Sequence, residues 1–247
     1  MTLETSQGIE VFQSSSSPKG KIDIDTDSLL FDPREAVDFT ATIFQACFGI
    51  EELIEARALF DHAAGKSFPD DTFYDQRTSY FLEYFCTMYR PNSLNPIDRI
   101  RASSIWESLS FADKSKILFV ENNRHSIYKL RKRKAKSMLL VDLIQGDHLK
   151  VEALDNQDFT HVNQSSMYQG FVFKKANFYY IGNGFLAHPE TASKWIGKIL
   201  KILIKSDRFD RKEFLLSLAR TNIRYHRHPH VGSGQFYQDL ASHLSAN

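Results

Sequence analysis

Apolar residues recur at spacings of three and four through the first half of the chain, and this periodicity is typical of amphipathic helices. Asp32 followed by Pro33 supplies a cap and a first helical residue. Five helices are therefore predicted between residues 32 and 121, and together they form a helical bundle. Their predicted ranges are 32–48, 50–64, 71–89, 95–106 and 110–120.

The pattern changes after Asn123, where apolar and polar positions begin to alternate with the period of two expected of β-strands. Turns are predicted at residues 145–147 and 174–177, where Gly, Asp, Asn and Lys gather. Four or five short strands are expected within residues 124–188. They predict a compact, strongly curved sheet or small barrel, because closing a sheet leaves few exposed edges.

Helical periodicity returns after His188, and it predicts helices over residues 191–205, 210–226 and 235–244. The expected fold class is α+β, with an N-terminal helical bundle, a small curved β module and C-terminal helices that pack on the rest. The predicted segments are a disordered tail over 1–30, a helical region over 31–123, the β module over 124–188 and the C-terminal helices over 189–247.

The charges of the whole chain almost cancel, since 31 Lys and Arg stand against 30 Asp and Glu for a net charge of +1. This balance argues against a dedicated nucleic-acid binder, although a local cluster of charge can still form a site. Cys47 and Cys86 lie within apolar helical patterns and are expected to be free thiols. No secretion signal or membrane span is predicted, so a cytoplasmic location is expected.

One segment, which we call the basic run, departs from this balance because its cations fall between residues 124 and 136 without one acid. The run contains Arg124, Lys129, Arg131, Lys132, Arg133, Lys134 and Lys136. On a regular strand Lys129, Arg131 and Arg133 would share one face, and Lys132, Lys134 and Lys136 the other. A strand with cations on both faces cannot lie flat on a core, so a protruding edge or hairpin is predicted.

The basic run has two interpretations. It can bind an anion such as a phosphate, a nucleotide, a nucleic acid or an acidic protein. It can equally be a solvated hairpin tip whose lysines guard an exposed strand edge. Tyr128 lies within the run and other aromatics lie near it. Cations beside stacking aromatics are typical of single-strand binders, and aromatics are also typical of the core of a small β module.

The sequence contains no known catalytic or nucleotide-binding signature, so no cofactor is predicted and a binding protein is expected rather than an enzyme. A catalytic group would need distant residues, for instance His125 with Asp142 or His188. Three alternating histidines near the C-terminus are a candidate zinc or nickel site, or the polar end of a helix. They are His226, His228 and His230.

Several short motifs carry a resemblance to a known family. They are Tyr80-Phe81-Leu82-Glu83-Tyr84-Phe85, Pro96-Ile97-Asp98-Arg99, Arg124-His125-Ser126-Ile127-Tyr128, Leu140-Val141-Asp142-Leu143-Ile144-Gln145-Gly146-Asp147 and Tyr180-Ile181-Gly182-Asn183-Gly184-Phe185-Leu186. Over residues 74–190 their order resembles a family of uncharacterised bacterial proteins, some of which neighbour a C-terminal SEC-C zinc-chelating motif. That motif is absent here. The resemblance implies helices followed by a small β module, and a bacterial origin; it implies no activity.

Taken together, these patterns predict a non-catalytic interaction or regulatory protein of the bacterial cytoplasm, in which the cationic edge of the β module docks a protein partner. The alternative is a nucleotide or nucleic-acid-binding module that uses the basic run. The candidate binding residues are Arg124, Tyr128, Lys129, Arg131, Lys132, Arg133, Lys134 and Lys136. The sequence leaves the oligomeric state open.

Overall fold

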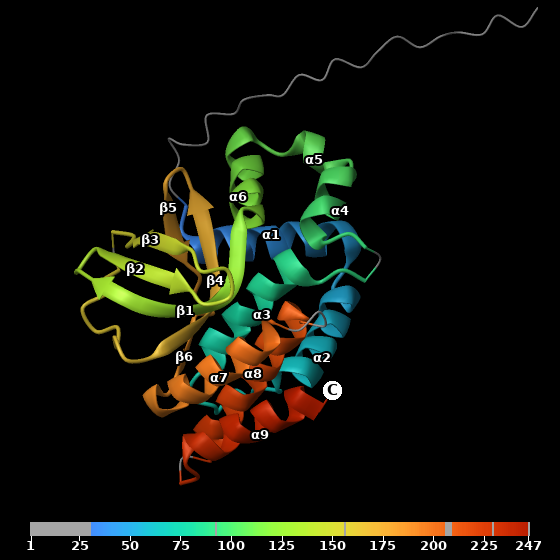
Figure 1. The fold of residues 1–247 in the computed structure, drawn as a ribbon. Coiled ribbons are helices and arrows are strands. Elements are labelled where there is room, and N and C mark those ends of the chain that lie inside the picture. Colours follow the sequence, from blue (N-terminus) through green and yellow to red (C-terminus); the bar gives the residue numbers. More distant parts are fainter. Residues whose placement is uncertain (1–30, 92, 156, 206–208, 229, 247) are drawn as a thin grey trace, which may run out of the picture.

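The computed structural model describes residues 31–91, 93–155, 157–205, 209–228 and 230–246. The predicted disordered tail, residues 1–30, lies outside the described residues. The described chain has the predicted α+β class, with helices before and after a six-stranded mixed sheet (Figure 1). None of the helices in the described ranges combines the length and hydropathy needed to cross a membrane.

The N-terminal helices begin where capping residues predict. Asp32 accepts a hydrogen bond from the Arg34 amide at 2.8 Å, and Asn95 forms a reciprocal capping box with Asp98. The helices are α1 (Pro33–Phe48), α2 (Glu51–Ala64), α3 (Tyr74–Met88), α4 (Pro96–Ala102), α5 (Ile105–Ser108) and α6 (Phe111–Glu121).

The single helix predicted over residues 95–106 is two helices in the structure. Ser103 is extended and its hydroxyl donates to the Ile100 carbonyl at 2.7 Å. A serine side chain that bonds to nearby backbone competes with the helical ladder, so α4 ends there and α5 starts one turn later.

The strands are β1 (Asn123–Arg133), β2 (Ser137–Asp142), β3 (His148–Glu152), β4 (Met167–Lys175), β5 (Phe178–Ile181) and β6 (Leu186–His188). Their order is β1-β2-β3-β5-β4-β6, and β1 also pairs with β4 along seven residues. The sheet is curved, as predicted, but it is not a complete barrel, since β3 and β5 share only the pair Val151 and Tyr179. The short strand β6 was not predicted, because three residues are too few to show a period of two.

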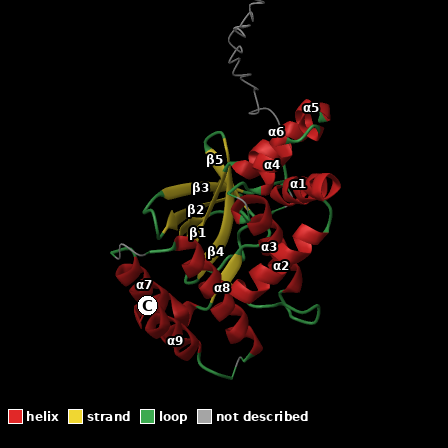
Figure 2. Cartoon of the chain, turned by 90° about the vertical axis from the view of Figure 1, so that its right-hand side faces the viewer, coloured by secondary structure: helices red, strands yellow, loops and turns green. Residues whose placement is uncertain are grey.

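The C-terminal part contains the short 3₁₀ helix η2 (Glu190–Ala192) and the helices α7 (Ser193–Leu203), α8 (Arg211–Arg227) and α9 (Ser233–Ala246). Asp210 caps α8 by accepting from the Glu213 amide at 3.0 Å. α8 lies against α2 and α9, whereas α7 lies at the outside of this group beside α9 (Figure 2).

Alternate residues of β4 face two different cores. Phe171 and Phe173 pack toward the N-terminal helices, in a core that also includes Phe85 of α3 and Leu216 of α8. Val172 faces the concave side of the sheet, where a separate core is closed by the loop residue Phe159. A third core joins α7, α8 and α9 to the sheet. Helices therefore cover β4 and the first half of β1, while the far ends of β1, β2 and β3 project from them (Figure 1).

Candidate functional site

The basic run extends along β1 from Arg124 and through the turn into β2, and its second half forms a protruding hairpin with β2. A β-bulge interrupts β1, because Leu130 pairs with Leu140 while Lys132 pairs with Leu139. Arg131 is the additional residue, and it shifts the alternation by one position. Lys129 pairs with Val141 and Lys132 with Leu139, so both lysines lie on the same outer face.

This bulge corrects the alternation predicted for the cations. On a regular strand Lys129 and Lys132 would lie on opposite faces, but the residue inserted at Arg131 brings them together. The reason is energetic: the inner face is packed with Tyr128 and Leu130, both at most 3% exposed, and has no room for an ammonium group.

The outer face continues across β2 and β3. Lys150 pairs with Leu139 from the other side, so a row runs Lys132, Leu139, Lys150 across three strands. The next row is Lys129, Val141, His148. We call this surface the cationic sheet face. It is defined by Lys129, Arg131, Lys132, Lys134 and Lys150 around the partly buried Leu139 and Val141.

A shallow depression of about 240 Å³ lies at the hairpin end of this face. It is lined by Lys132, Arg133, Lys134, Ser137, Met138, Leu139 and Lys150. Lys150 is also paired with Glu152 at 2.9 Å. The lining therefore combines an apolar centre with a positive rim.

Other cations of the basic run are held by the fold itself. Arg124 pairs with Asp147 at 2.7 Å and lies 3.6 Å from the buried Asp142. Lys136 donates to the carbonyls of Asp155 and Gln157, at 2.7 and 2.9 Å. Arg133 donates to the carbonyl of Val162. Lys136 and Arg133 fasten the hairpin to the loop after β3, and Arg124 fastens the start of β1 to the turn between β2 and β3, so all three are less available to a ligand than the cations of the cationic sheet face.

Tyr128 does not present its ring to solvent. It is fully buried, its hydroxyl donates to the Arg124 carbonyl at 2.8 Å, and its ring stacks on Phe185. Tyr168, Phe171 and Phe173 are buried in the same way. These aromatic side chains therefore belong to the hydrophobic core and are not exposed for base stacking.

The histidines considered for catalysis belong to a buried chain of hydrogen bonds. His125 Nε2 contacts the Tyr80 hydroxyl at 2.7 Å, and Gln169 Nε2 donates to that hydroxyl at 2.6 Å. Gln169 Oε1 lies 3.1 Å from His188 Nε2, and His188 Nδ1 lies 2.8 Å from the Tyr237 hydroxyl. Four elements distant in sequence, α3, β1, β4 and β6, thus meet α9 through one polar chain.

The donors and acceptors of this chain fix the protonation of both rings. Because the Gln169 amide nitrogen donates to Tyr80, its oxygen must accept from His188 Nε2. Tyr80 then has His125 Nε2 as the acceptor for its own proton, which places the ring proton of His125 on Nδ1, a buried atom without a hydrogen-bond partner among the described residues. Burial lowers the pKa of His125 and of His188 to about 3, so both rings are neutral at pH 7.

Asp142, one of the two partners considered for His125, lies outside this chain of hydrogen bonds. Asp142 accepts from the Ser126 hydroxyl at 2.5 Å and from the amides of Ile144 and Gln145, and these bonds close the turn between β2 and β3. The His125 ring stacks on Phe171 instead, with centroids 4.2 Å apart. Since both histidines are at most 4% exposed, a substrate has no access to them in this conformation.

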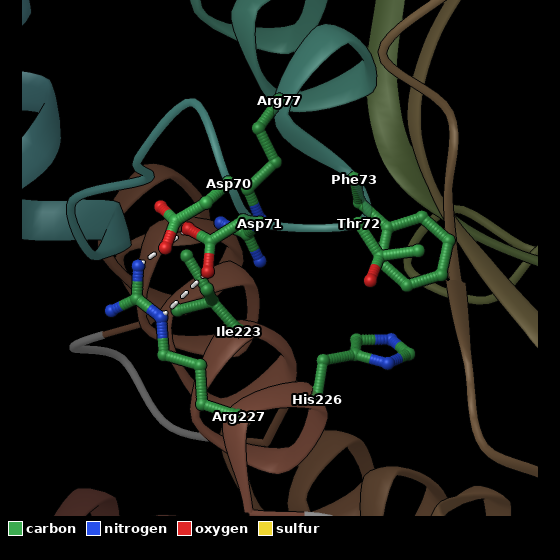
Figure 3. A pocket seen from close by; sticks show the side chains of 8 residues that line it. All are labelled: Asp70, Asp71, Thr72, Phe73, Arg77, Ile223, His226 and Arg227. Atoms are coloured by element: carbon green, nitrogen blue, oxygen red, sulfur yellow. Dashed lines mark hydrogen bonds and ion pairs between the residues drawn. The ribbon is translucent and has the colours of Figure 1, made fainter.

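A second hollow, of about 140 Å³, lies between the loop before α3 and the end of α8 (Figure 3). Arg77 forms part of its wall and donates to the carbonyls of Ala64 and Ala219, at 3.3 and 2.5 Å, and burial lowers its pKa to about 10. Arg227 is paired with Asp71 at 2.6 Å, and Asp70 lies beside it. Two arginines thus face two aspartates, and the balanced charge gives this hollow no preference for an anion or a cation.

The three alternating histidines do not come together. His226 packs against Phe73 in the wall of that hollow, with ring centroids 4.5 Å apart, and burial lowers its pKa (Figure 3). His228 stacks on Phe236 of α9, and its ring also contacts that of His230, with centroids 6.0 Å apart. Across the part of the chain that the structure describes, no group of three His, Cys, Asp or Glu is placed to hold a metal ion.

Two parts of the site were missed by sequence reasoning. Lys150 lies outside the basic run, and only the pairing of β2 with β3 brings it beside Lys132. Gln169 is the centre of the buried chain of hydrogen bonds, but a single glutamine in an apolar strand does not predict that role. The one local signal was its position between the apolar residues Met167 and Phe171, on the face that packs against the helices.

Comparison of the chain with models of protein families, with curated proteins and with solved structures gave no match.

Proposed function

We propose that the protein is a non-catalytic docking protein whose cationic sheet face binds an acidic segment of a protein partner. The observation that carries this proposal is the row Lys132, Leu139, Lys150, in which an apolar side chain lies between two lysines on an uncovered part of the sheet. Such a row matches a segment that alternates acidic and apolar residues.

Charge supports the proposal. No acid occurs between residues 122 and 141, and Lys129, Arg131, Lys132 and Lys134 are exposed without an ion pair to another described residue. Several unpaired cations on one rigid element produce a local positive potential although the whole chain is nearly neutral. A negatively charged segment is therefore attracted to this face.

The first test uses a fluorescent peptide that alternates Asp and Leu, with binding followed by anisotropy at about 0.1 M salt. Replacing Arg131, Lys132 and Lys134 by Glu should weaken binding roughly ten- to a hundredfold, because three attractions become repulsions. Replacing Leu139 by Ser should weaken it severalfold without changing its salt dependence, since that change removes an apolar contact only.

The matched control reverses three exposed lysines of the C-terminal helices, Lys194, Lys201 and Lys205, and so makes the same change in net charge. It should leave peptide binding within about twofold, because charges beyond a Debye length are screened. Equal losses in the two triple variants, or no binding by the unaltered protein, would contradict the proposal.

A nucleotide or nucleic-acid ligand is the second candidate, and the depression lined by Lys132, Lys134 and Lys150 favours it. Ammonium groups around a hollow of this size suit a phosphate group. The burial of Tyr128 counts against base stacking on this face. An oligonucleotide of the same charge as the peptide decides between the two: tighter binding of the oligonucleotide, lost in the same Glu variants, supports the nucleotide reading.

We further propose that the protein works in the bacterial cytoplasm, as the resemblance to that bacterial family implies. Cys47 and Cys86 are free thiols, which suits a reducing compartment. Tagging the chain and fractionating the cells that produce it naturally would test the location.

A further inference from the structure

The outer side of α7 and the turn that follows it carry a stripe of lysines at spacings of four, three and four. They are Lys194, Lys198, Lys201 and Lys205, and all four are exposed. At 3.6 residues per turn these positions fall within one narrow sector of the helix. No acid occurs between residues 191 and 205, and none of the four lysines forms an ion pair with another described residue.

The side chains on the opposite side of α7 are buried in the core. Ile196, Ile199 and Leu200 are at most 4% exposed and pack with residues of α8 and α9. The lysine stripe therefore points away from the molecule, and α7 lies at the outside of the C-terminal helices (Figure 2). The acids on the elements packed against α7 are Glu190 of η2, Glu213 of α8 and Asp239 of α9, and Glu213 lines a hollow beside α2, so this side of the molecule keeps a positive excess.

Large apolar side chains flank the lysine stripe. Ile202 is 54% exposed and Ile204 is 46% exposed, although isoleucine is usually buried. Trp195 is partly exposed on the same flank as Ile202, seven residues earlier, and Lys198 lies over its ring at 4.7 Å. Trp195 packs against the core of the C-terminal helices while remaining partly exposed, whereas neither Ile202 nor Ile204 belongs to that core.

Lysines that alternate with exposed isoleucine and an indole are the side chains that favour the headgroup layer of a membrane. An anionic bilayer offers negative charge to the ammonium groups and, just below it, an apolar layer to Ile202 and Ile204. A nucleic acid offers charge without that apolar layer. We propose that this surface, the α7 lipid face, binds peripherally to membranes that contain anionic lipid.

This inference does not depend on the proposed function, since it concerns a different helix and a different ligand. Vesicles of about one third phosphatidylglycerol in phosphatidylcholine, and vesicles of phosphatidylcholine alone, are the probes. The protein contains two tryptophans, so the Trp106→Phe variant leaves Trp195 as the sole reporter. On the anionic vesicles its emission should shift to the blue and be quenched by brominated lipid, with little change on neutral vesicles.

Two variants separate the contributions of charge and apolar contact. Replacing Lys194, Lys201 and Lys205 by Glu should lower partitioning at least a hundredfold, at roughly fivefold per charge. Replacing Ile202 and Ile204 by Ser should lower it about tenfold, because less apolar surface enters the bilayer. These side chains are exposed, so both variants should keep the far-UV circular dichroism of the unaltered protein.

The variant with Glu at positions 131, 132 and 134 is the matched control and should partition within about threefold of the unaltered protein. An equal loss in this control would overturn the assignment to α7. So would failure of the unaltered protein to bind the anionic vesicles, or binding that leaves Trp195 emission and the isoleucine variant unchanged. Peptide binding at the cationic sheet face is scored separately, so the two proposals can fail independently.

Discussion

Glu83 is a carboxyl group enclosed by the fold. It lies on α3 at 2% exposure, and its Oε1 accepts from the Gly184 amide at 2.9 Å. Its Oε2 has no hydrogen-bond partner among the described residues. Burial raises the pKa of Glu83 to about 8, so the carboxyl group is mostly protonated at pH 7. A Cβ on Gly182 would lie 2.3 Å from the same carboxyl group, which explains the need for glycine in this loop.

The raised pKa makes stability depend on pH. The unfolded glutamate ionises near 4.5 and the folded one near 8, so the folded state holds more protons between these values. The free energy of unfolding should fall by up to about 1.4 kcal/mol per pH unit as the pH rises through this window. In Glu83→Gln, whose amide oxygen can still accept from Gly184, this slope should disappear.

Urea unfolding between pH 6.5 and 9 measures the effect. His125 and His188 act in the opposite direction, since their lowered pKa removes stability only as the pH falls below about 6.5. Exposed Glu107 on α5 offers a control, because Glu107→Gln should keep the slope of the unaltered protein. An unchanged slope in Glu83→Gln would show that Glu83 is ionised in the fold.

At the scale of elements, α8 is held by side chains that reach its backbone and its polar groups. Gln169 of β4 donates to the Leu215 carbonyl at 2.6 Å, and Arg77 of α3 donates to the Ala219 carbonyl at 2.5 Å. Asn222 of α8 donates in turn to the Ala187 carbonyl of β6 at 2.9 Å. A carbonyl oxygen has a second lone pair, so these bonds add to the helical ladder without replacing it. The position of α8 on the sheet is therefore fixed by polar contacts as well as by packing.

Gln169→Leu tests this attachment. The change removes the donor to Tyr80 and the acceptor of His188, and it leaves buried polar groups without partners. The free energy of unfolding should fall by about 3 kcal/mol, since each buried polar group left without a hydrogen bond costs roughly 1 to 3 kcal/mol. Chemical denaturation measures it, with exposed Gln235→Leu on α9 as the control that should change it by less than about 0.5 kcal/mol. A loss below about 1 kcal/mol would mean that the chain of hydrogen bonds contributes little.

At the scale of the molecule, the cores join segments that are far apart in the sequence. One core contains residues of α1 to α3, α6, β4 and α8, and another joins β1 and β4 to the three C-terminal helices. The predicted division at residues 123 and 188 marks changes of secondary structure, and each of these cores crosses at least one of them. Shared cores favour cooperative unfolding.

The two tryptophans allow a test of cooperativity. Trp106 lies in α5 and Trp195 in α7. The Trp106→Phe variant therefore reports only on the C-terminal part, through Trp195. The Trp195→Phe variant reports only on the N-terminal part, through Trp106. Fluorescence of each variant and its far-UV circular dichroism should give coincident denaturation midpoints. Midpoints that differ between fluorescence and circular dichroism in one variant would reveal parts that unfold separately.

The sequence by itself determined the local features of this protein. Helical periodicity, the caps at Asp32, Asn95 and Ser110, and the turn at Gly146, whose φ is +81°, all depend on residues close together in the chain. Those signals were enough to predict the α+β class, the curved sheet and a basic hairpin that protrudes from it.

Only the tertiary structure decided which side chains meet. The bulge at Arg131 turned Lys132 to the face of Lys129, strand pairing added Lys150, and the packing of α9 joined Tyr237 to His188. The physical reason is that such contacts depend on register and on packing between distant segments, and neither leaves a periodic trace in the sequence. The same limit applied to α7, whose lysine stripe became a distinct surface only once its opposite side was seen to be filled by the core.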